Sequence, residues 1–201
     1  MKYALLLLIA GVFSQHTYAQ HTYAQQTAAA QQTPAAQTAL PAPQAPNVQL
    51  AAPPIGGFRT IIGQQVPAFS FEIEKGKTVN IRDYKGKYVL INFFATWCPP
   101  CNQELPLAQK QIWEKHKDNP KFAFIVFGRE EGWEKLNPFK EKKGFTFPLL
   151  PDLDRSIFSL FAPNGIPRNV VVDPAGKIIY QSFGYEEAEF EKLVKLIDSK
   201  L

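Results

Sequence analysis

The continuous apolar run YVLINFF at residues 88–94 restricts the fold of this chain more than any other feature. Its branched and aromatic side chains are typical of a strand that is buried on both faces. A second run, FAFIVFG at residues 122–128, has the same character. Between them we expect a helix from about Pro99 to Lys117, kinked at Pro106 because proline lacks the N–H that a helix interior uses. Strands of this kind predict a sheet that is covered by helices.

Shorter patterns predict the other strands. Residues 69–74 alternate apolar and polar side chains, and residues 75–81 supply a turn and a second short strand. These two segments are expected to form a hairpin at the start of the fold. Residues 169–182 predict another hairpin, whose turn lies at Asp173–Gly176.

Helical patterns account for most of the remaining sequence. Residues 131–144 predict a helical segment that is interrupted at Pro138, and residues 154–161 predict a short helix that Asp154 caps. The chain ends in an amphipathic helix with one apolar stripe, formed by Phe190, Leu193, Val194 and Ile197. The order of elements predicts a single α/β domain: a central mixed β-sheet flanked by helices, with the first hairpin as an N-terminal extension.

The start of the chain has the pattern of a secretory signal peptide, which we expect at residues 1–19. Lys2 precedes ten apolar residues, Ala4–Phe13, and Thr17-Tyr18-Ala19 is an acceptable cleavage site. Ten apolar residues are too few to cross a bilayer, which needs about 20. The alternatives are an uncleaved anchor, which alone would give the protein a membrane contact, and a buried strand. Export predicts a periplasmic or otherwise extracytoplasmic location, where disulfides persist.

The next segment, residues 20–57, is rich in Ala, Gln and Pro and has no charged residue. Such a composition offers too few aromatic and branched side chains to build a core. We therefore expect a disordered leader or tether at 20–57 and a folded domain at 58–201. In that domain both signs of charge are interspersed, and no stripe of Lys and Arg alternates with aromatic residues. No nucleic-acid partner is expected.

The chain contains two cysteines, Cys98 and Cys101, in the motif WCPPC. A disulfide between them would close a very short loop, so it would add little stability. A structural zinc site needs four ligands, and a copper carrier needs a further soft or imidazole ligand. The only methionine is Met1, and no histidine follows His116. A redox-active pair is thus the favoured interpretation, with no metal and no cofactor.

The position of Cys98 supports this interpretation. A strand leads into it and a helix starts directly after it, which places its sulfur at a helix N-terminus. The unpaired N–H groups there and the helix dipole both stabilise a thiolate. Cys98 is therefore the expected attacking thiol, and Cys101 is expected to resolve the mixed disulfide.

The motifs NFFATWCPPCNQELP and GIPRNVVVDPAGKI resemble the thioredoxin superfamily, and specifically its exported TlpA/ResA-like thiol–disulfide oxidoreductases. The resemblance covers about residues 64–200. It implies that Cys98 is the exposed nucleophile and Cys101 the buried resolving thiol. It also implies that Glu104 helps to move their protons. The alternative for Glu104 is an exposed residue that favours the first turns of a helix.

The resemblance further implies a set of substrate-binding residues. Trp97 matches the aromatic beside the site, although ordinary core packing is the other interpretation. Pro167 matches a cis-proline that lies against the disulfide, and Ile166 matches the residue that offers its backbone to a substrate chain. Arg168 departs from the threonine common in thioredoxins. It would stabilise the thiolate or select acidic partners, or else point to solvent.

Together these features predict a thiol–disulfide oxidoreductase that reduces the disulfides of client proteins. The resemblance implies that its electrons come from a membrane thiol donor. One alternative is a peroxiredoxin-like thiol peroxidase, but Ala95 and Ile91 stand where that motif requires Thr or Ser and Pro. The other is a redox-inactive or metal-carrying adaptor with the same fold.

Overall fold

A computed structural model describes residues 57–201, and the predicted signal peptide and almost all of the predicted tether lie outside these residues. The strands are β1 (Ser70–Glu74), β2 (Lys77–Asn80), β3 (Tyr88–Phe94), β4 (Phe122–Arg129), β5 (Leu149–Asp152), β6 (Arg168–Val172) and β7 (Ile178–Phe183). The helices are α1 (Pro99–Ala108), α2 (Glu114–His116), α3 (Trp133–Lys143), α4 (Phe158–Phe161) and α5 (Glu187–Lys200). A single 3₁₀ turn covers Ile81–Tyr84, and a wider π-helical turn covers Gln109–Trp113 between α1 and α2.

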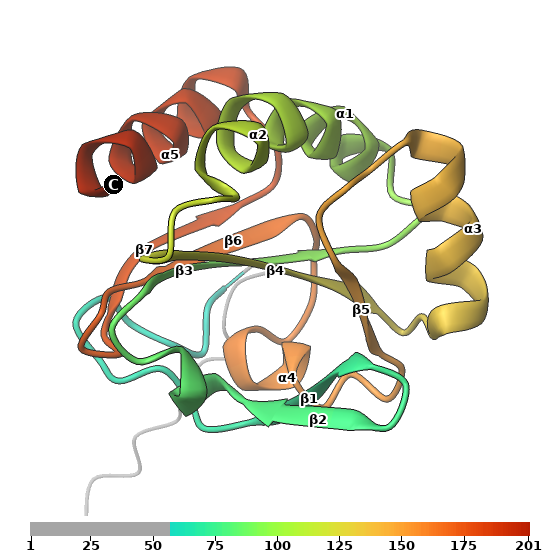
Figure 1. The fold of residues 1–201 in the computed structure, drawn as a ribbon, viewed down its shortest axis with the longest axis horizontal. Coiled ribbons are helices and arrows are strands. Elements are labelled where there is room, and N and C mark those ends of the chain that lie inside the picture. Colours follow the sequence, from blue (N-terminus) through green and yellow to red (C-terminus); the bar gives the residue numbers. More distant parts are fainter. Residues whose placement is uncertain (1–56) are drawn as a thin grey trace, which may run out of the picture. The chain divides into compact units, whose positions relative to one another are not determined.

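The central sheet has the strand order β5-β4-β3-β6-β7, and β1 and β2 form a separate hairpin. β3, β4 and β5 run parallel to one another, whereas β6 and β7 are antiparallel to their neighbours. The sheet is therefore mixed, as predicted. Helices α1, α2 and α5 cover one face, and α4 with the β1–β2 hairpin covers the other (Figure 1).

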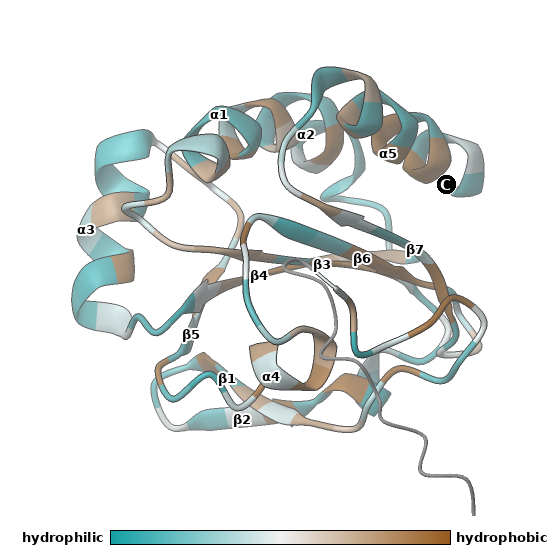
Figure 2. Cartoon of the chain, turned by 180° about the vertical axis from the view of Figure 1, so that it is seen from behind, coloured by the Kyte–Doolittle hydropathy of each residue, from teal (hydrophilic) through white to brown (hydrophobic). Residues whose placement is uncertain are grey.

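Each face of the sheet has its own apolar core. On the first face the buried stripe of α5 packs against residues of α1 and β3. The second face carries a dense group of phenylalanines, among which Phe93, Phe127 and Phe158 are fully buried. Figure 2 shows the amphipathic character of α5, which is brown on one side and teal on the other, whereas α3 is mostly teal. The strand that the sequence predicted as buried on both faces, β3, lies at the centre of the sheet.

The long helical region after the cysteines has the predicted extent and buried face, and it also contains a π-helical turn. It runs from Pro99 to His116 and contains Pro106. The expected inner face is buried, formed by Leu105, Ala108 and Ile112. The π-helical turn begins directly after α1 and was not predicted. Within residues 57–201 no helix combines the length and the apolar character needed to cross a membrane.

Two of the predictions for the helices are wrong. α3 continues through Pro138 without a break, because the fully buried Leu136 anchors it and Gly144, at φ 67°, closes its C-terminus. Asp154 does not cap α4. Its carboxylate instead accepts the N–H of Ser156 in the preceding turn, and Asp152 accepts the N–H groups of the residues that begin α4.

The short edge strand β5 was not predicted. Its four residues, LLPD, include Pro151, which has no N–H to give to a sheet. β5 pairs with β4 over Leu149–Asp152 at the edge of the sheet, where only one side of the strand has a partner. The strand conformation of this segment therefore depends on its pairing with β4, and the pattern of its own residues does not predict it.

Candidate functional site

The two cysteines lie where β3 passes into α1. Cys98 is the N-cap residue of α1, and it forms a disulfide with Cys101 across the first turn. The backbone N–H of Cys101 donates to Sγ of Cys98 at 3.3 Å. Pro99 and Pro100 occupy first-turn positions whose N–H groups have no use inside the helix. The helix N-terminus thus directs an N–H and the positive end of its dipole at the sulfur expected to carry negative charge.

Both cysteines are buried in this oxidised form. Cys101 is fully buried, and Cys98 is 2% exposed, so the expected exposure of Cys98 is not found. The reason is the loop before β6, because the carbonyl oxygen of Ile166 lies 3.9 Å from Sγ of Cys98. The peptide bond between Ile166 and Pro167 is cis, as the family resemblance implied.

Trp97 lies beside the disulfide and is 63% exposed, so its interpretation as an ordinary core residue is wrong. The guanidinium of Arg129 lies 5.9 Å from the centre of its ring. A large exposed aromatic side chain next to a reactive pair offers an apolar surface to a partner chain. Trp97 adjoins Cys98 in the chain, and Ile166 reaches the same disulfide from the loop before β6.

Glu104 lies in the interior, 2% exposed, and not on the helix surface as the alternative interpretation required. Its Oε1 accepts a hydrogen bond from Nδ2 of Asn92 at 2.8 Å and another from Nδ2 of Asn169 at 3.1 Å. Burial away from water raises the pKa of Glu104 to about 7, and the two amide donors oppose that rise. A carboxyl with this pKa exchanges protons readily near neutral pH.

The amides that hold Glu104 belong to a polar row across the sheet. Asn92 of β3 pairs in register with Asn169 of β6, and Asn169 pairs with Ser182 of β7. Nδ2 of Asn92 also donates to Oδ1 of Asn169 at 2.9 Å, which fixes the orientation of the second amide. Neither Asn169 nor Ser182 was predicted as a site residue from the sequence. The available signal was a single amide inside an otherwise apolar strand, as in NVVV at 169–172.

Glu131 is another residue that sequence reasoning missed. It is 1% exposed, and its carboxylate accepts the backbone N–H of Thr96 at 2.9 Å and the hydroxyl of Thr96 at 2.6 Å. Asn102 donates to the carbonyl oxygens of Thr96 and Cys98 from the other side. These contacts fix the loop between β3 and α1, and with it the position of Cys98.

Arg168 does not point to solvent, because it is fully buried. Its guanidinium lies between the rings of Phe58 and Phe183, 4.5 and 4.6 Å from their centres. Nε and Nη2 donate to backbone carbonyl oxygens of Asn164 and Gly165. Removal from water lowers the pKa of Arg168 to about 10, so it remains a cation at neutral pH.

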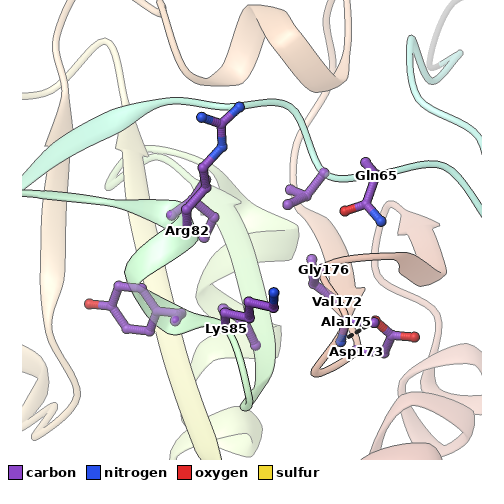
Figure 3. A pocket seen from close by; sticks show the side chains of 11 residues that line it. Gln65, Arg82, Lys85, Val172, Asp173, Ala175 and Gly176 are labelled. Atoms are coloured by element: carbon purple, nitrogen blue, oxygen red, sulfur yellow. Dashed lines mark hydrogen bonds between the residues drawn. The ribbon is translucent and has the colours of Figure 1, made fainter.

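The remaining candidate features lie away from the disulfide. Within residues 57–201 no three His, Cys, Asp or Glu side chains are grouped as a metal site would require. A cavity of about 300 Å³ lies at the start of β3, the end opposite the cysteines (Figure 3). Val89 and Val172 contribute to its apolar lining, and Arg82 and Lys85 border it. No predicted site residue lines this cavity.

Fold and site together define a class of protein. A mixed sheet of this topology, a disulfide at the junction of β3 and α1, and a cis-proline directly after the residue that contacts Cys98 are the attributes of thiol–disulfide oxidoreductases with a thioredoxin fold. The chain belongs to the AhpC/TSA family, whose model matches residues 62–181.

Individual relatives support this class. The chain is 30% identical over 117 residues to the thiol–disulfide oxidoreductase ResA of Bacillus subtilis, a match that covers 58% of this chain and 64% of ResA. It is 35% identical over 117 residues to the thioredoxin-like protein YneN of the same organism, covering 58% of this chain and 68% of YneN. A solution structure from Bacteroides thetaiotaomicron, provisionally described as a protein disulfide isomerase, has a TM-score of 0.69 and 39% identity. That match covers 72% of this chain and 92% of the other.

Proposed function

We propose that the protein reduces disulfide bonds in client proteins outside the cytoplasm, using Cys98 and Cys101 as its redox pair. The observation that carries the proposal is the Cys98–Cys101 disulfide at the N-terminus of α1. The ResA relative, named a thiol–disulfide oxidoreductase, supports thiol–disulfide exchange as the chemistry, and the signal-like residues 1–19 support the compartment.

The first step is attack on the client. The thiolate of reduced Cys98 attacks one sulfur of a client disulfide, which forms a mixed disulfide and breaks the client S–S bond. The released client sulfur leaves as a thiolate and takes up a proton. The N–H of Cys101 and the dipole of α1 stabilise the thiolate form of Cys98 before the attack. Trp97 and the backbone of Ile166 border the position that the client chain would occupy.

The second step resolves the mixed disulfide. Cys101 loses its proton and attacks Sγ of Cys98, which forms the Cys98–Cys101 disulfide and releases the second client thiolate. Glu104 lies one helical turn after Cys101, and its raised pKa suits it to accept that proton. In sum, two electrons and two protons pass from the Cys98–Cys101 pair to the client. A thiol donor at the membrane would return the pair to the reduced state.

The reduction potential of the Cys98–Cys101 pair tests the direction of the reaction. It is measured by equilibration with glutathione and dithiothreitol buffers. A value near that of thioredoxin, about −270 mV, supports a reductant. A value near −120 mV would identify an oxidant that installs disulfides, and the proposed direction would be wrong.

Insulin reduction tests the mechanism. Cys98→Ser should abolish it, whereas Cys101→Ser should retain the attack and accumulate the mixed disulfide with insulin, visible on a non-reducing gel. Retained insulin reduction in Cys98→Ser would rule out the mechanism. Rapid consumption of peroxide by the wild type would instead favour the peroxidase alternative. Separation of bacterial cell fractions tests the compartment.

A further inference from the structure

The loop that carries Ile166 is held in place by contacts with residues outside α1, the helix at whose start both cysteines lie. Its carbonyl oxygens at Asn164 and Gly165 accept hydrogen bonds from the side chain of Arg168, at 2.6 Å for the Nη2 bond and 2.9 Å for the Nε bond to Gly165. The next carbonyl along the chain is that of Ile166, 3.9 Å from Sγ of Cys98. The position of the Arg168 side chain therefore determines how this loop meets the disulfide.

Two aromatic rings enclose the guanidinium. Phe183 pairs in register with Arg168 across β6 and β7. Its ring also lies against Gly165, where a Cβ would stand only 2.4 Å from Cε2 of Phe183. Gly165 has φ 78°, so this close approach and this backbone conformation both require glycine. One side of the guanidinium is thus closed by a residue of the sheet itself.

The other side is closed by Phe58, near the start of the described residues. Its ring centre lies 4.5 Å from the guanidinium carbon of Arg168. Backbone contacts fix Phe58 there, because the N–H of Arg59 donates to the carbonyl of Phe161 at 2.7 Å. Nε2 of Gln181 donates to the carbonyl of Thr60 at 3.1 Å. Phe58 lies ahead of residues 62–181, the part of the chain that matches the family model.

We propose that Phe58 and Arg168 are positioning residues of the disulfide-exchange site. Phe58 holds the Arg168 guanidinium against Phe183, and Arg168 holds the loop that presents Ile166 to Cys98 and to a client chain. A cation between two aromatic faces, removed from water, gains attraction from both rings. The inference rests on the proposed function, since a client chain is what the positioned loop would bind.

The test compares a protein disulfide with a small one. Fully reduced full-length protein is mixed with insulin or with 5,5′-dithiobis(2-nitrobenzoate), and the second-order rate constant is measured for each. Insulin needs the loop, whereas the small reagent needs only the Cys98 thiolate. Phe58→Ala should slow the reaction with insulin by about fivefold to tenfold and leave the small reagent within about twofold. Phe58→Tyr keeps an aromatic face, so the ratio of its rate constants for insulin and for the small reagent should equal that of the wild type.

Two further variants separate positioning from stability. Arg168→Met keeps the length of the side chain and removes its hydrogen bonds to the carbonyls of Asn164 and Gly165. Its melting temperature should fall, because these acceptors lose their donor. At a temperature where the variant remains folded, its insulin rate should fall while its rate with the small reagent stays within about twofold. Ile62→Ala removes an apolar side chain from the same N-terminal segment, where Ile62 is 63% exposed, and should change neither rate. Equal ratios of the two rate constants in wild type, Phe58→Ala and Arg168→Met would overturn the proposal.

Hydrogen exchange provides a readout that does not depend on activity. The N–H of Gly184 donates to the carbonyl of Pro167 at 2.9 Å, so its exchange reports on the loop. Phe58→Ala should accelerate exchange at residues 164–168 and 183–184 but not in α3. Unchanged exchange at the loop would overturn the inference. If the wild type failed to reduce insulin while the loop still loosened in Phe58→Ala, the proposed function would fail and the positioning of the loop would stand.

Discussion

Glu104 and Asp152 are both buried carboxylates, 2% and 3% exposed, and burial raises the pKa of each. Their hydrogen-bond donors differ. Asp152 uses one oxygen for the N–H of Ile157 at 3.0 Å and the other for the N–H of Phe158 at 2.8 Å. Glu104 accepts both of its hydrogen bonds, from side-chain amides, on the single oxygen Oε1.

This difference separates a structural carboxylate from one suited to chemistry. Both oxygens of Asp152 are occupied by the backbone of the helix that follows, so its removal would leave buried N–H groups unsatisfied. Oε2 of Glu104 has no hydrogen-bond partner among residues 57–201 and is the atom at which a proton can be gained or lost. The raised pKa does not distinguish the two carboxylates, whereas the occupancy of their oxygens does.

The largest expected effect concerns Asp152 and stability. Asp152→Ala should lower the free energy of unfolding by roughly 2–4 kcal/mol, because it leaves two buried backbone N–H groups without an acceptor. Urea unfolding measures this change. The matched control is Asp154→Ala, the residue that the sequence pattern favoured as the cap, and it should have a clearly smaller effect. Equal effects of the two substitutions would contradict the assigned cap.

An intermediate effect on stability is expected for Glu104, and its substitution should raise the free energy of unfolding. The folded-state pKa of about 7 lies above the value near 4.5 of an unperturbed glutamate. As pH rises, the Glu104 carboxyl therefore loses its proton in the unfolded chain before it does so in the folded protein. Deprotonation thus favours the unfolded chain, and the free energy of unfolding falls as pH rises from about 4.5 to 7. Glu104→Gln keeps an acceptor for both amides and should make the oxidised protein more stable than wild type by roughly 2–3 kcal/mol at pH 8.

The same variant should slow the resolution step. Unfolding of wild type and Glu104→Gln at pH 4 and at pH 8 measures the change in stability. The decay of the mixed disulfide with insulin measures the rate of the resolution step. At pH 4 both states of the wild type bind the proton, so the difference in stability should nearly vanish. A stability difference that is independent of pH would refute the raised pKa.

The smallest expected effect concerns Asn169. Its Nδ2 donates to the ionised carboxylate of Glu104 and so lowers the pKa of that group. Asn169→Ala should raise the pKa of Glu104 further, by about half a unit. The carboxyl carbon shift of Glu104 in oxidised protein, followed by NMR as pH changes, measures it. Ser182→Ala is the control, since Ser182 contacts Asn169 and not the carboxylate. An equal shift in the control would assign the effect to general loosening.

Sequence patterns predicted the elements whose buried side chains form a continuous apolar run or a regular apolar stripe. The run at 88–94 coincides with β3, and the stripe of α5 is buried as its periodicity required. β5 was missed because four residues with a proline carry no local pattern. The cap of α4 was misassigned because Asp152 and Asp154 are equally plausible by type, and only the three-dimensional turn decides between them.

The site was predictable to the extent that its residues are close in sequence. Cys98, Cys101 and Glu104 lie on one helix, and their spacing already suggested a common role. The roles of Phe58 and Phe183 depend on contacts between segments far apart in the chain, which no local pattern contains. Arg168 was expected near the site, but its burial between two rings was not foreseen, because a lone arginine on the surface is the ordinary case.

The cover over Cys98 also sets an order of events during synthesis. Ile166 follows Cys98 by 68 residues, and Phe183, which encloses Arg168, comes later still. A chain that emerges from its N-terminus presents both thiols well before the segment that shields them exists. During that interval neither Ile166 nor the residues that position its loop can lie over Cys98. The cover over Cys98 is therefore complete only once the last hairpin has formed.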